Sequence, residues 1–210
     1  MHPSAYTVMD LYERHAAAWD RARSRLLAER AWLDRFRAAM APHGAVLDLG
    51  CGAGEPLAGH LIRGGHRVMG VDASPSLVAL AAARLPDHAW IVHDMRRIAL
   101  DAQFDGILAW DSFFHLTRDD QRAMFAVFRA HAAPGAALLF TSGPSDGEAI
   151  GTFQGEPLYH ASLGPEVYRG LLAENGFEVV QHVAEDETCG GHTVWLARRN
   201  EAAPHKGSGA

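Results

Sequence analysis

Three alternating glycines follow a short apolar segment in the first quarter of the chain. The segment 45–49 has the length and composition of a buried strand, and Gly50, Gly52 and Gly54 come directly after it. Residues 55–62 then show helical spacing. Glycine has no Cβ, so it permits the tight turn and lets a ligand lie close to the backbone. The pattern predicts a ligand-binding turn between a strand and a helix.

Three aspartates stand where further predicted strands end. Asp72, Asp94 and Asp111 each follow an apolar run with the length of a strand. In a parallel sheet the ligand lies beyond the carboxyl ends of the strands, so we expect these carboxylates to share one site with the glycine turn. Asp72 comes 72 − 54 = 18 residues after Gly54. That distance suits a carboxylate that accepts hydrogen bonds from the two hydroxyls of a ribose.

Two classes of cofactor use such a turn. Dehydrogenases that bind dinucleotides favour the spacing G-x-G-x-x-G, but here the third residue after Gly52 is Glu55, and the spacing is G-x-G-x-G. Asp48, just before the turn, is a poor neighbour for a pyrophosphate and a reasonable one for a cationic amino-acid group. A dehydrogenase is therefore a distant alternative.

Strands and helices alternate along most of the chain. The expected strands are 45–49, 67–71, 90–93, 104–110, 136–141, 177–182 and 193–197. The alternation predicts an α/β fold with a doubly wound, mostly parallel sheet and helices on both faces. The last two strands are joined by a turn too short for a crossover helix, so we expect them to be antiparallel.

The length of 210 residues allows one ordinary domain with a small cap. Residues 1–42 carry apolar side chains at helical spacing and are expected to form an N-terminal helical cap, with residues 43–200 as the core. Residues 142–164 are expected to be a long loop that covers the substrate. The polar tail 201–210 is expected to be disordered.

Composition restricts the possible partners. The net charge is 19 − 25 = −6, which disfavours general binding to nucleic acid or to an anionic membrane. No apolar run approaches the ~20 residues of a membrane helix, and residues 1–10 lack the pattern of a secretory signal. We therefore expect a cytoplasmic protein. The two cysteines, Cys51 and Cys189, indicate no disulfide framework, and no cluster of ligands predicts a metal site.

Together these motifs resemble those of the class I S-adenosylmethionine-dependent methyltransferases, over roughly residues 45–198. Val-Leu-Asp-Leu-Gly-Cys-Gly-Ala-Gly, residues 46–54, is similar to the first motif of that family, and Gly-Val-Asp-Ala-Ser, 70–74, to the second. His-Asp-Met, 93–95, resembles the third motif, and the segment 104–111 the fourth. The resemblance implies a Rossmann-like sheet of seven strands whose final strand is antiparallel, with S-adenosyl-L-methionine as cofactor.

The resemblance also implies roles for individual residues. Asp72 would bind the ribose, Asp94 the adenine edge, and the aromatic residues of an N-terminal cap helix over 12–19 would close over the cofactor. The cofactor-binding residues expected are Trp19, Asp48, Gly50, Cys51, Gly52, Gly54, Asp72, Ala73, Asp94, Met95, Trp110 and Asp111.

Tyr12, Phe114 and Tyr159 are the residues expected to contact the substrate. His115 is the first candidate for a general base and His160 the second, because an imidazole titrates near neutral pH. A base helps if the acceptor is a hydroxyl or a protonated amine. It is not needed for a thiolate or a neutral amine.

Three functions remain open from the sequence. The leading one is methyl transfer by in-line displacement to an O, N or S atom of a small molecule, by a monomer or a homodimer. The second is an RNA or protein methyltransferase, for which Arg21, Arg23 and Arg25 are the nearest basic residues, although successive odd positions do not share one helix face. Asp-Ser-Phe-Phe, 111–114, stands where family members that methylate planar amino groups have Asn/Asp-Pro-Pro-Tyr. The third function is a non-catalytic module that binds S-adenosylmethionine.

Overall fold

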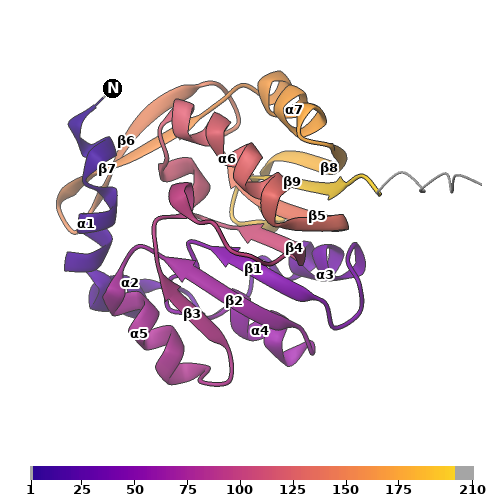
Figure 1. Cartoon of the computed structure of the whole chain (residues 1–210). Helices are drawn as coiled ribbons and strands as arrows, with labels where there is room; N and C mark the ends of the chain where they lie inside the picture. The colour runs from indigo at the N-terminus through magenta and orange to yellow at the C-terminus, as the bar shows by residue number, and fades with distance from the viewer. Residues whose placement is uncertain (1, 202–210) are drawn as a thin grey trace, which may run out of the picture.

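A seven-stranded sheet forms the centre of the computed structural model, which describes residues 2–201 (Figure 1). The strands lie in the order β3-β2-β1-β4-β5-β9-β8. Their bounds are β1 Ala45–Leu49, β2 Arg67–Asp72, β3 Ala89–Val92, β4 Phe104–Ala109, β5 Ala132–Ser142, β8 Phe177–Asp186 and β9 His192–Arg199. The first five are parallel, and β9 pairs antiparallel with both β5 and β8. The predicted α/β fold with an antiparallel final strand is confirmed.

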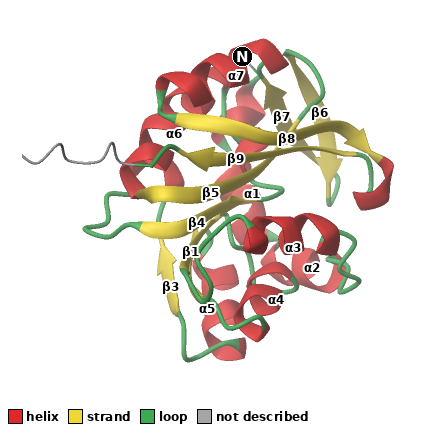
Figure 2. Cartoon of the chain, turned by 90° about the vertical axis from the view of Figure 1, so that its right-hand side faces the viewer, coloured by secondary structure: helices red, strands yellow, loops and turns green. Residues whose placement is uncertain are grey.

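Helices cover both faces of this sheet, as Figure 2 shows from the side. Their bounds are α1 Val8–Arg14, α2 Ala16–Ala22, α3 Arg30–Ala38, α4 Leu57–Arg63, α5 Pro75–Arg84, α6 Arg118–His131 and α7 Pro165–Glu174. Val46 and Leu108 pack in one cluster with α3 and α4, while Leu47 and Ile107 pack in another with α6 and α7. Because both faces are buried, the central strands are continuously apolar.

Helix starts follow the local sequence signals. Ser74 caps α5 by accepting a hydrogen bond from the Leu77 amide at 3.2 Å, and Pro75 occupies the first turn. Thr117 caps α6 in the same way through the Asp120 amide at 3.1 Å. These caps place Ser74 and Thr117 at the carboxyl edge of the sheet, where the candidate site lies.

The expectation of a long loop over 142–164 is wrong. The segment is a β-hairpin, with β6 Gly147–Phe153 paired antiparallel to β7 Glu156–Ser162. Gln154 and Gly155 form the turn with φ values of 51° and 81°. Two successive residues with positive φ match the twist of a tight hairpin, which explains why this segment folds back on itself.

The N-terminal helices also differ from expectation. A single helix over 12–19 is wrong, because the chain leaves helical geometry at His15, between α1 and α2. Helix α1 lies beside the hairpin (Figure 1), where Val8 and Leu11 pack on Leu158 and Tyr159. Helix α1 is therefore packed against the hairpin.

Two further expectations concern the C-terminal tail and membrane-spanning helices. Apart from Glu201, the tail 201–210 lies outside the described residues. Within residues 2–201, every helix is too short or too polar to cross a bilayer.

Candidate active site

A cavity lies at the carboxyl ends of β1, β2 and β4, underneath the N-terminal helices. The space between its lining residues is about 960 Å³, a figure that includes open solvent at its mouth. Its lining consists of Ala5, Tyr6, Val8, Met9, Tyr12, Trp19, Gly50, Gly52, Asp72, Ala73, Ser74, Leu77, Asp94, Met95, Arg96, Asp111, Ser112, His115, Leu116, Thr117 and Asp120.

The glycine turn forms the floor of this cavity. Gly50 and Gly52 have φ values of 77° and 54°, which side chains with a Cβ rarely adopt. A Cβ on Gly50 would lie 2.2 Å from the Ser112 Cβ, and one on Gly52 would lie 2.6 Å from the Trp19 ring. The turn therefore needs glycine both for its conformation and for close packing beneath the helical cap.

Asp72 joins the glycine turn to the start of α5. One carboxylate oxygen accepts from the Gly52 amide and the other from the Ser74 amide, both at 2.9 Å. Burial raises the pKa of Asp72, while these hydrogen bonds oppose that shift. Each oxygen keeps a free lone pair, so the side chain can accept hydrogen bonds from a ligand in the cavity.

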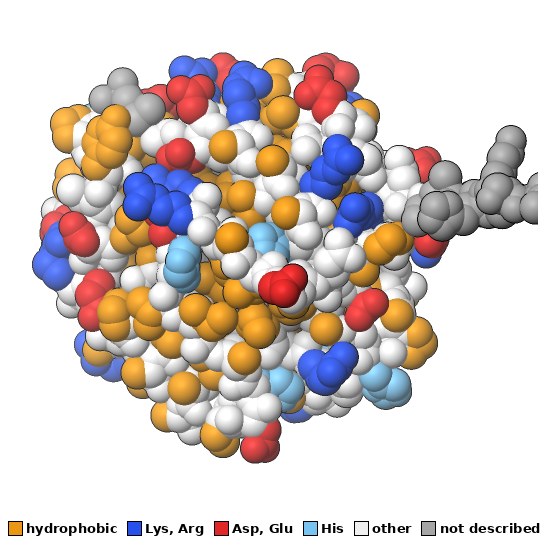
Figure 3. Space-filling model, viewed as in Figure 1, with side chains coloured by type: hydrophobic (Ala, Val, Ile, Leu, Met, Phe, Trp, Pro, Cys, Tyr) orange, Lys and Arg blue, Asp and Glu red, His pale blue; other side chains and the backbone are white. Residues whose placement is uncertain are grey.

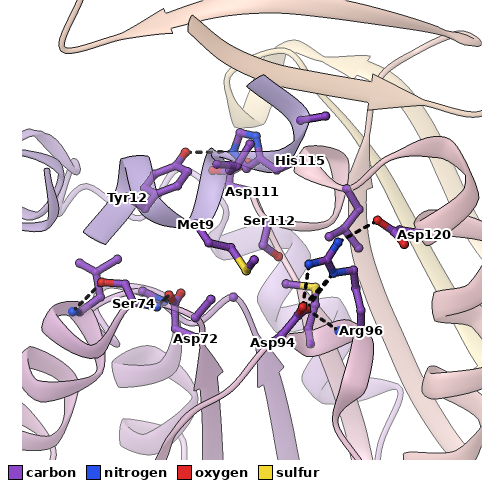
Figure 4. A pocket seen from close by; sticks show the side chains of 18 of the residues that line it. Met9, Tyr12, Asp72, Ser74, Asp94, Arg96, Asp111, Ser112, His115 and Asp120 are labelled. Atoms are coloured by element: carbon purple, nitrogen blue, oxygen red, sulfur yellow. Dashed lines mark hydrogen bonds and ion pairs between the residues drawn. The ribbon is translucent and has the colours of Figure 1, made fainter. Parts of the chain in front are cut away.

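Asp94 is bound on both oxygens by Arg96 (Figure 4). The Arg96 Nη1 also contacts Asp120 at 3.0 Å, so the guanidinium bridges two carboxylates. Burial raises the pKa of Asp94, but the hydrogen bonds and charge of Arg96 outweigh it and lower the pKa below its usual value. Sequence reasoning missed Arg96, although its place two residues after Asp94 is the signal that could have found it.

Tyr12 and His115 meet at the top of the cavity (Figure 4). The Tyr12 hydroxyl lies 2.9 Å from the His115 Nε2, and the His115 Nδ1 lies 2.9 Å from the Tyr159 carbonyl. Burial lowers the pKa of His115 to about 4, so the ring is neutral at pH 7. A carbonyl can only accept, so the network assigns the proton to Nδ1 and leaves Nε2 to accept from Tyr12.

Asp111 lies at the centre of a second group of charged side chains. Its φ is 51°, in the left-handed region, and its carboxylate lies 2.8 Å from the His192 Nε2 and 3.8 Å from the Arg23 guanidinium. The His192 Nδ1 faces the Cys189 carbonyl at 2.5 Å. The hydrogen bond to Asp111 raises the pKa of His192. Both ring nitrogens thus face acceptors, which favours the imidazolium.

Most of the residues predicted for the site do line the cavity. They are Tyr12, Trp19, Gly50, Gly52, Asp72, Ala73, Asp94, Met95, Asp111 and His115.

Three of the predicted cofactor residues do not line the cavity and lie in or beneath the glycine turn. Asp48 is only 4% exposed, and its burial, together with the charge of Asp72, raises its pKa to about 7. The Cys51 sulfur packs close to Gly70, and Gly54 packs against Leu85 and Trp90 instead of the cavity. Asp48, Cys51 and Gly54 are therefore placed in or beneath the turn, and their expected contacts with the cofactor stay predictions.

Trp110 and Tyr159 point away from the cavity. Trp110 packs with Leu139 and Val194 on the face of the sheet that α3 covers. Tyr159 is fully buried between α1 and the hairpin, and only its backbone carbonyl reaches His115. The structure therefore does not bring these two side chains into the lining of the cavity, and their expected contacts with cofactor and substrate stay predictions.

Phe114 and His160 line a different cavity. It lies between the hairpin and the end of β5, next to the first one. The His160 ring centroid is 4.8 Å from that of His115 and 5.5 Å from that of Phe114. His160 therefore lies next to His115 but lines the second cavity, and its expected role as a second base stays a prediction.

Comparison with known proteins agrees with this geometry. A family profile described as a methyltransferase domain matches residues 46–135. The Bacillus subtilis (strain 168) protein named "Putative methyltransferase YqeM" is 31% identical over 137 residues, which cover 62% of this chain and 54% of that protein. The chain thus spans about half the length of this curated relative.

Solved structures show the same fold. The S-adenosylmethionine-bound structure of CalS10, an amino pentose methyltransferase from Micromonospora echinaspora, matches with a TM-score of 0.70 and 24% identity. The match covers 89% of this chain and 96% of that one. DhpI in complex with S-adenosylhomocysteine matches with a TM-score of 0.75 and 22% identity, over 96% of this chain and 100% of that one.

The methyltransferase-domain profile thus matches the part of the chain that forms the floor of the cavity, and CalS10, which shares the fold, is a methyltransferase. The methyltransferase fold accounts for the strand order and for the antiparallel β9. The matched residues 46–135 contain the glycine turn, Asp72, Asp94 and His115. The N-terminal helices, which cover the cavity, and the hairpin, which packs against α1, lie outside this matched region.

Proposed function

We propose that this methyltransferase binds S-adenosyl-L-methionine in the cavity and transfers its methyl group to a small molecule. One observation carries the proposal: the glycine turn, Asp72 and Asp94 line a single cavity together with the Tyr12–His115 pair. The first three suit a nucleoside, and the pair lies across the cavity from them. Donor and acceptor of a methyl group would thus share one enclosed space.

The chemistry of the lining fits the cofactor. Asp72 offers lone pairs for the two hydroxyls of a ribose, and Met95 and Leu77 offer apolar surface for a base. Asp94 offers a carboxylate to the adenine edge, where it shares its lone pairs with Arg96. When bound, S-adenosylmethionine supplies an electrophilic methyl group on a positively charged sulfur.

The protein's contribution is chiefly orientation and exclusion of water. Met9, Tyr12 and Trp19 cover the cavity from above and hold an acceptor against the floor. Holding two reactants in line can contribute several kcal/mol, on the order of 7–11 in the best cases. His115, through Tyr12, is the group placed to take a proton from a hydroxyl acceptor.

A small acceptor is favoured over a macromolecule. The N-terminal helices lie directly over the cavity, which leaves little room for a polymer. Figure 3 shows Lys and Arg side chains scattered over this face, with no continuous basic stripe. CalS10, which shares the fold, is a methyltransferase of an amino pentose.

Calorimetric titration with S-adenosylhomocysteine tests the proposal, with NADH as the control ligand. We expect micromolar binding of the former and none of the latter. Asp72→Asn should weaken binding at least tenfold, because a charged acceptor contributes roughly 1.5–3 kcal/mol. The matched variant Asp101→Asn, at an exposed position, should bind as the wild type does. Equal affinity of the two variants, or preferential binding of NADH, would overturn the assignment.

A further inference from the structure

Three hydroxyl groups that line the cavity, those of Tyr12, Ser74 and Ser112, donate their protons to other protein groups. His115 holds its own proton on Nδ1 toward the Tyr159 carbonyl, so its Nε2 must receive the proton of Tyr12. Tyr12 therefore presents only oxygen lone pairs to the cavity. The direction of this hydrogen bond follows from the fact that a carbonyl cannot donate.

The serine hydroxyls show the same direction. Ser112 donates to the Leu49 carbonyl at 2.7 Å, and Ser74 donates to the Glu13 carboxylate at 2.5 Å. Thr117 accepts from the Asp120 amide, and its side chain belongs to a residue that is only 7% exposed. The lining thus offers a ligand several oxygen acceptors and few free hydroxyl donors.

The charges in the lining point the same way. Asp72 and Asp94 are assigned to the cofactor, so the carboxylates left for the acceptor are Asp111 and Asp120. Against the guanidinium of Arg96 they give a formal charge of −2 + 1 = −1. All three nitrogens of Arg96 contact Asp94 or Asp120. The two cations that contact Asp111 belong to His192 and Arg23, and neither of these residues lines the cavity.

We propose that the acceptor is a small molecule with an amino group, and that this lining selects against carboxylate and phosphate acceptors. The inference rests on the proposed function and names its substrate class. An amine brings N–H donors and positive charge to a wall that offers oxygen acceptors and whose one guanidinium is already paired with Asp94 and Asp120. An anion would meet carboxylates and committed hydroxyls, and burying it unpaired would be costly.

Methyl transfer to an amine conserves charge inside the acidic cavity. The ammonium first releases one proton to water. The nitrogen lone pair then forms the N–C bond while the S–C bond breaks and its electron pair stays on sulfur. One positive charge passes from sulfur to nitrogen, and the methylated ammonium leaves. Tyr12, which accepts an N–H of the amine, orients the lone pair, and no protein group has to remove a proton during transfer.

Binding to the protein saturated with S-adenosylhomocysteine tests this selection without turnover. The probes are matched ring compounds, in which cyclohexylamine, cyclohexanol and cyclohexanecarboxylate represent one scaffold and benzylamine, benzyl alcohol and benzoate another. Ligand-observed NMR should show binding of the amines, weakened by added salt, and none of the carboxylates. Carboxylates that bind as well as the amines, or amines that fail to bind, would overturn the inference. Failure of S-adenosylhomocysteine itself to bind would instead overturn the proposed function.

Two substitutions locate the selection. Asp120→Asn releases one contact of Arg96, so the preference for amine over carboxylate should fall at least threefold. Asp119→Asn, at the exposed neighbouring position of α6, should leave the preference unchanged. Tyr12→Phe removes the lone pairs offered to the amine and should weaken amine binding roughly 3–10-fold, the value of one hydrogen bond. Equal preference in the Asp119 and Asp120 variants would show that Arg96 and its partners do not set the substrate class.

Discussion

The two ring nitrogens of His115 have opposite hydrogen-bonding roles, one as a donor and the other as an acceptor. Nδ1 faces a carbonyl in the hairpin, and Nε2 faces the Tyr12 hydroxyl from α1. Sequence reasoning identified the residue from its place after β4. It could not identify the tautomer, because both partners come from segments far away in the chain. The tautomer matters because it decides which groups in the cavity can still donate.

We predict that His115 carries its proton on Nδ1 and stays neutral at pH 6, because burial lowers its pKa to about 4. Long-range ¹H–¹⁵N NMR of the imidazole nitrogens measures both properties. Tyr12→Phe should shift the Nε2 resonance by removing its donor and leave the Nδ1 proton in place. An Nε2–H tautomer, or titration near pH 6.5, would contradict the hydrogen-bond directions on which the acceptor class depends.

The pair of His192 and Asp111 predicts how stability varies with pH. The hydrogen bond to Asp111 raises the pKa of His192 above its unfolded value. The stabilisation is therefore complete below about pH 6.5 and is lost as the pH rises through the folded pKa. His192→Gln should lower the free energy of unfolding by about 1 kcal/mol at pH 6 and by less at pH 10.

Urea unfolding at the two pH values measures this effect. Asp111→Asn is the matched variant, since asparagine tolerates the positive φ of this position. It should remove the same pH dependence. A loss of stability in His192→Gln that is as large at pH 10 as at pH 6 would show that the pair contributes packing instead of charge.

Local motifs predicted the floor of the site but not its walls. The glycines and Asp72 lie within one strand–helix–strand unit formed by β1, α4 and β2, so their spacing suffices to place them. Arg96 contacts Asp120 only after folding, and His192 reaches Asp111 across 192 − 111 = 81 residues. Trp110 follows a strand that is apolar on both faces, and such a pattern does not tell which face a side chain occupies.

At the scale of elements, the strand-to-helix turn carries the strictest requirement for glycine. We predict that Gly52→Ala destabilises the protein by about 1–2 kcal/mol, because φ is +54° and the new Cβ meets Trp19. It should also weaken binding of S-adenosylhomocysteine by displacing that ring. Thermal unfolding and calorimetry measure the two effects.

Gly170→Ala is the matched control for this substitution. Gly170 lies within α7, and nothing lies within 4 Å of a Cβ built there. Alanine should stabilise this helix by roughly 0.5–1 kcal/mol and leave ligand binding unchanged. If both variants bound S-adenosylhomocysteine as the wild type does, the turn would not form the floor of the binding site.

The hairpin shows why one element escaped prediction. Its turn, Gln154-Gly155, is not one of the dipeptides most typical of a tight hairpin, and β6 lacks alternation of apolar and polar residues. Strand β7 of the hairpin is stabilised by tertiary packing, since Leu158 and Tyr159 are buried against α1. A strand that depends on such a partner is hard to recognise from local sequence alone.

At the scale of the whole molecule, the N-terminal helices are tied down on two sides of the cavity. Glu13 accepts hydrogen bonds from Ser74 and Ser76 at the start of α5. Arg14 and His15 contact Glu156 at the end of the hairpin. The roof thus spans from α5 to the hairpin, and ligand exchange requires at least one of these attachments to loosen.

We predict that Glu156→Gln speeds the dissociation of S-adenosylhomocysteine about 2–5-fold, a modest effect because solvent screens exposed ion pairs. Hydrogen exchange should increase in residues 2–22 and not in β1 to β5. The control is Glu174→Gln, at an exposed position in α7 away from the roof. Unchanged dissociation and exchange in Glu156→Gln would mean that the hairpin contact does not help to close the cavity.

The central claim is that one cavity brings the methyl donor and the acceptor together. A crystal structure of the protein with S-adenosylhomocysteine tests it most directly. We predict that the ribose hydroxyls lie on Asp72, the adenine beside Asp94 and Met95, and the sulfur faces the Tyr12–His115 pair. A ligand bound outside this cavity, or one whose sulfur points away from Tyr12, would contradict the account.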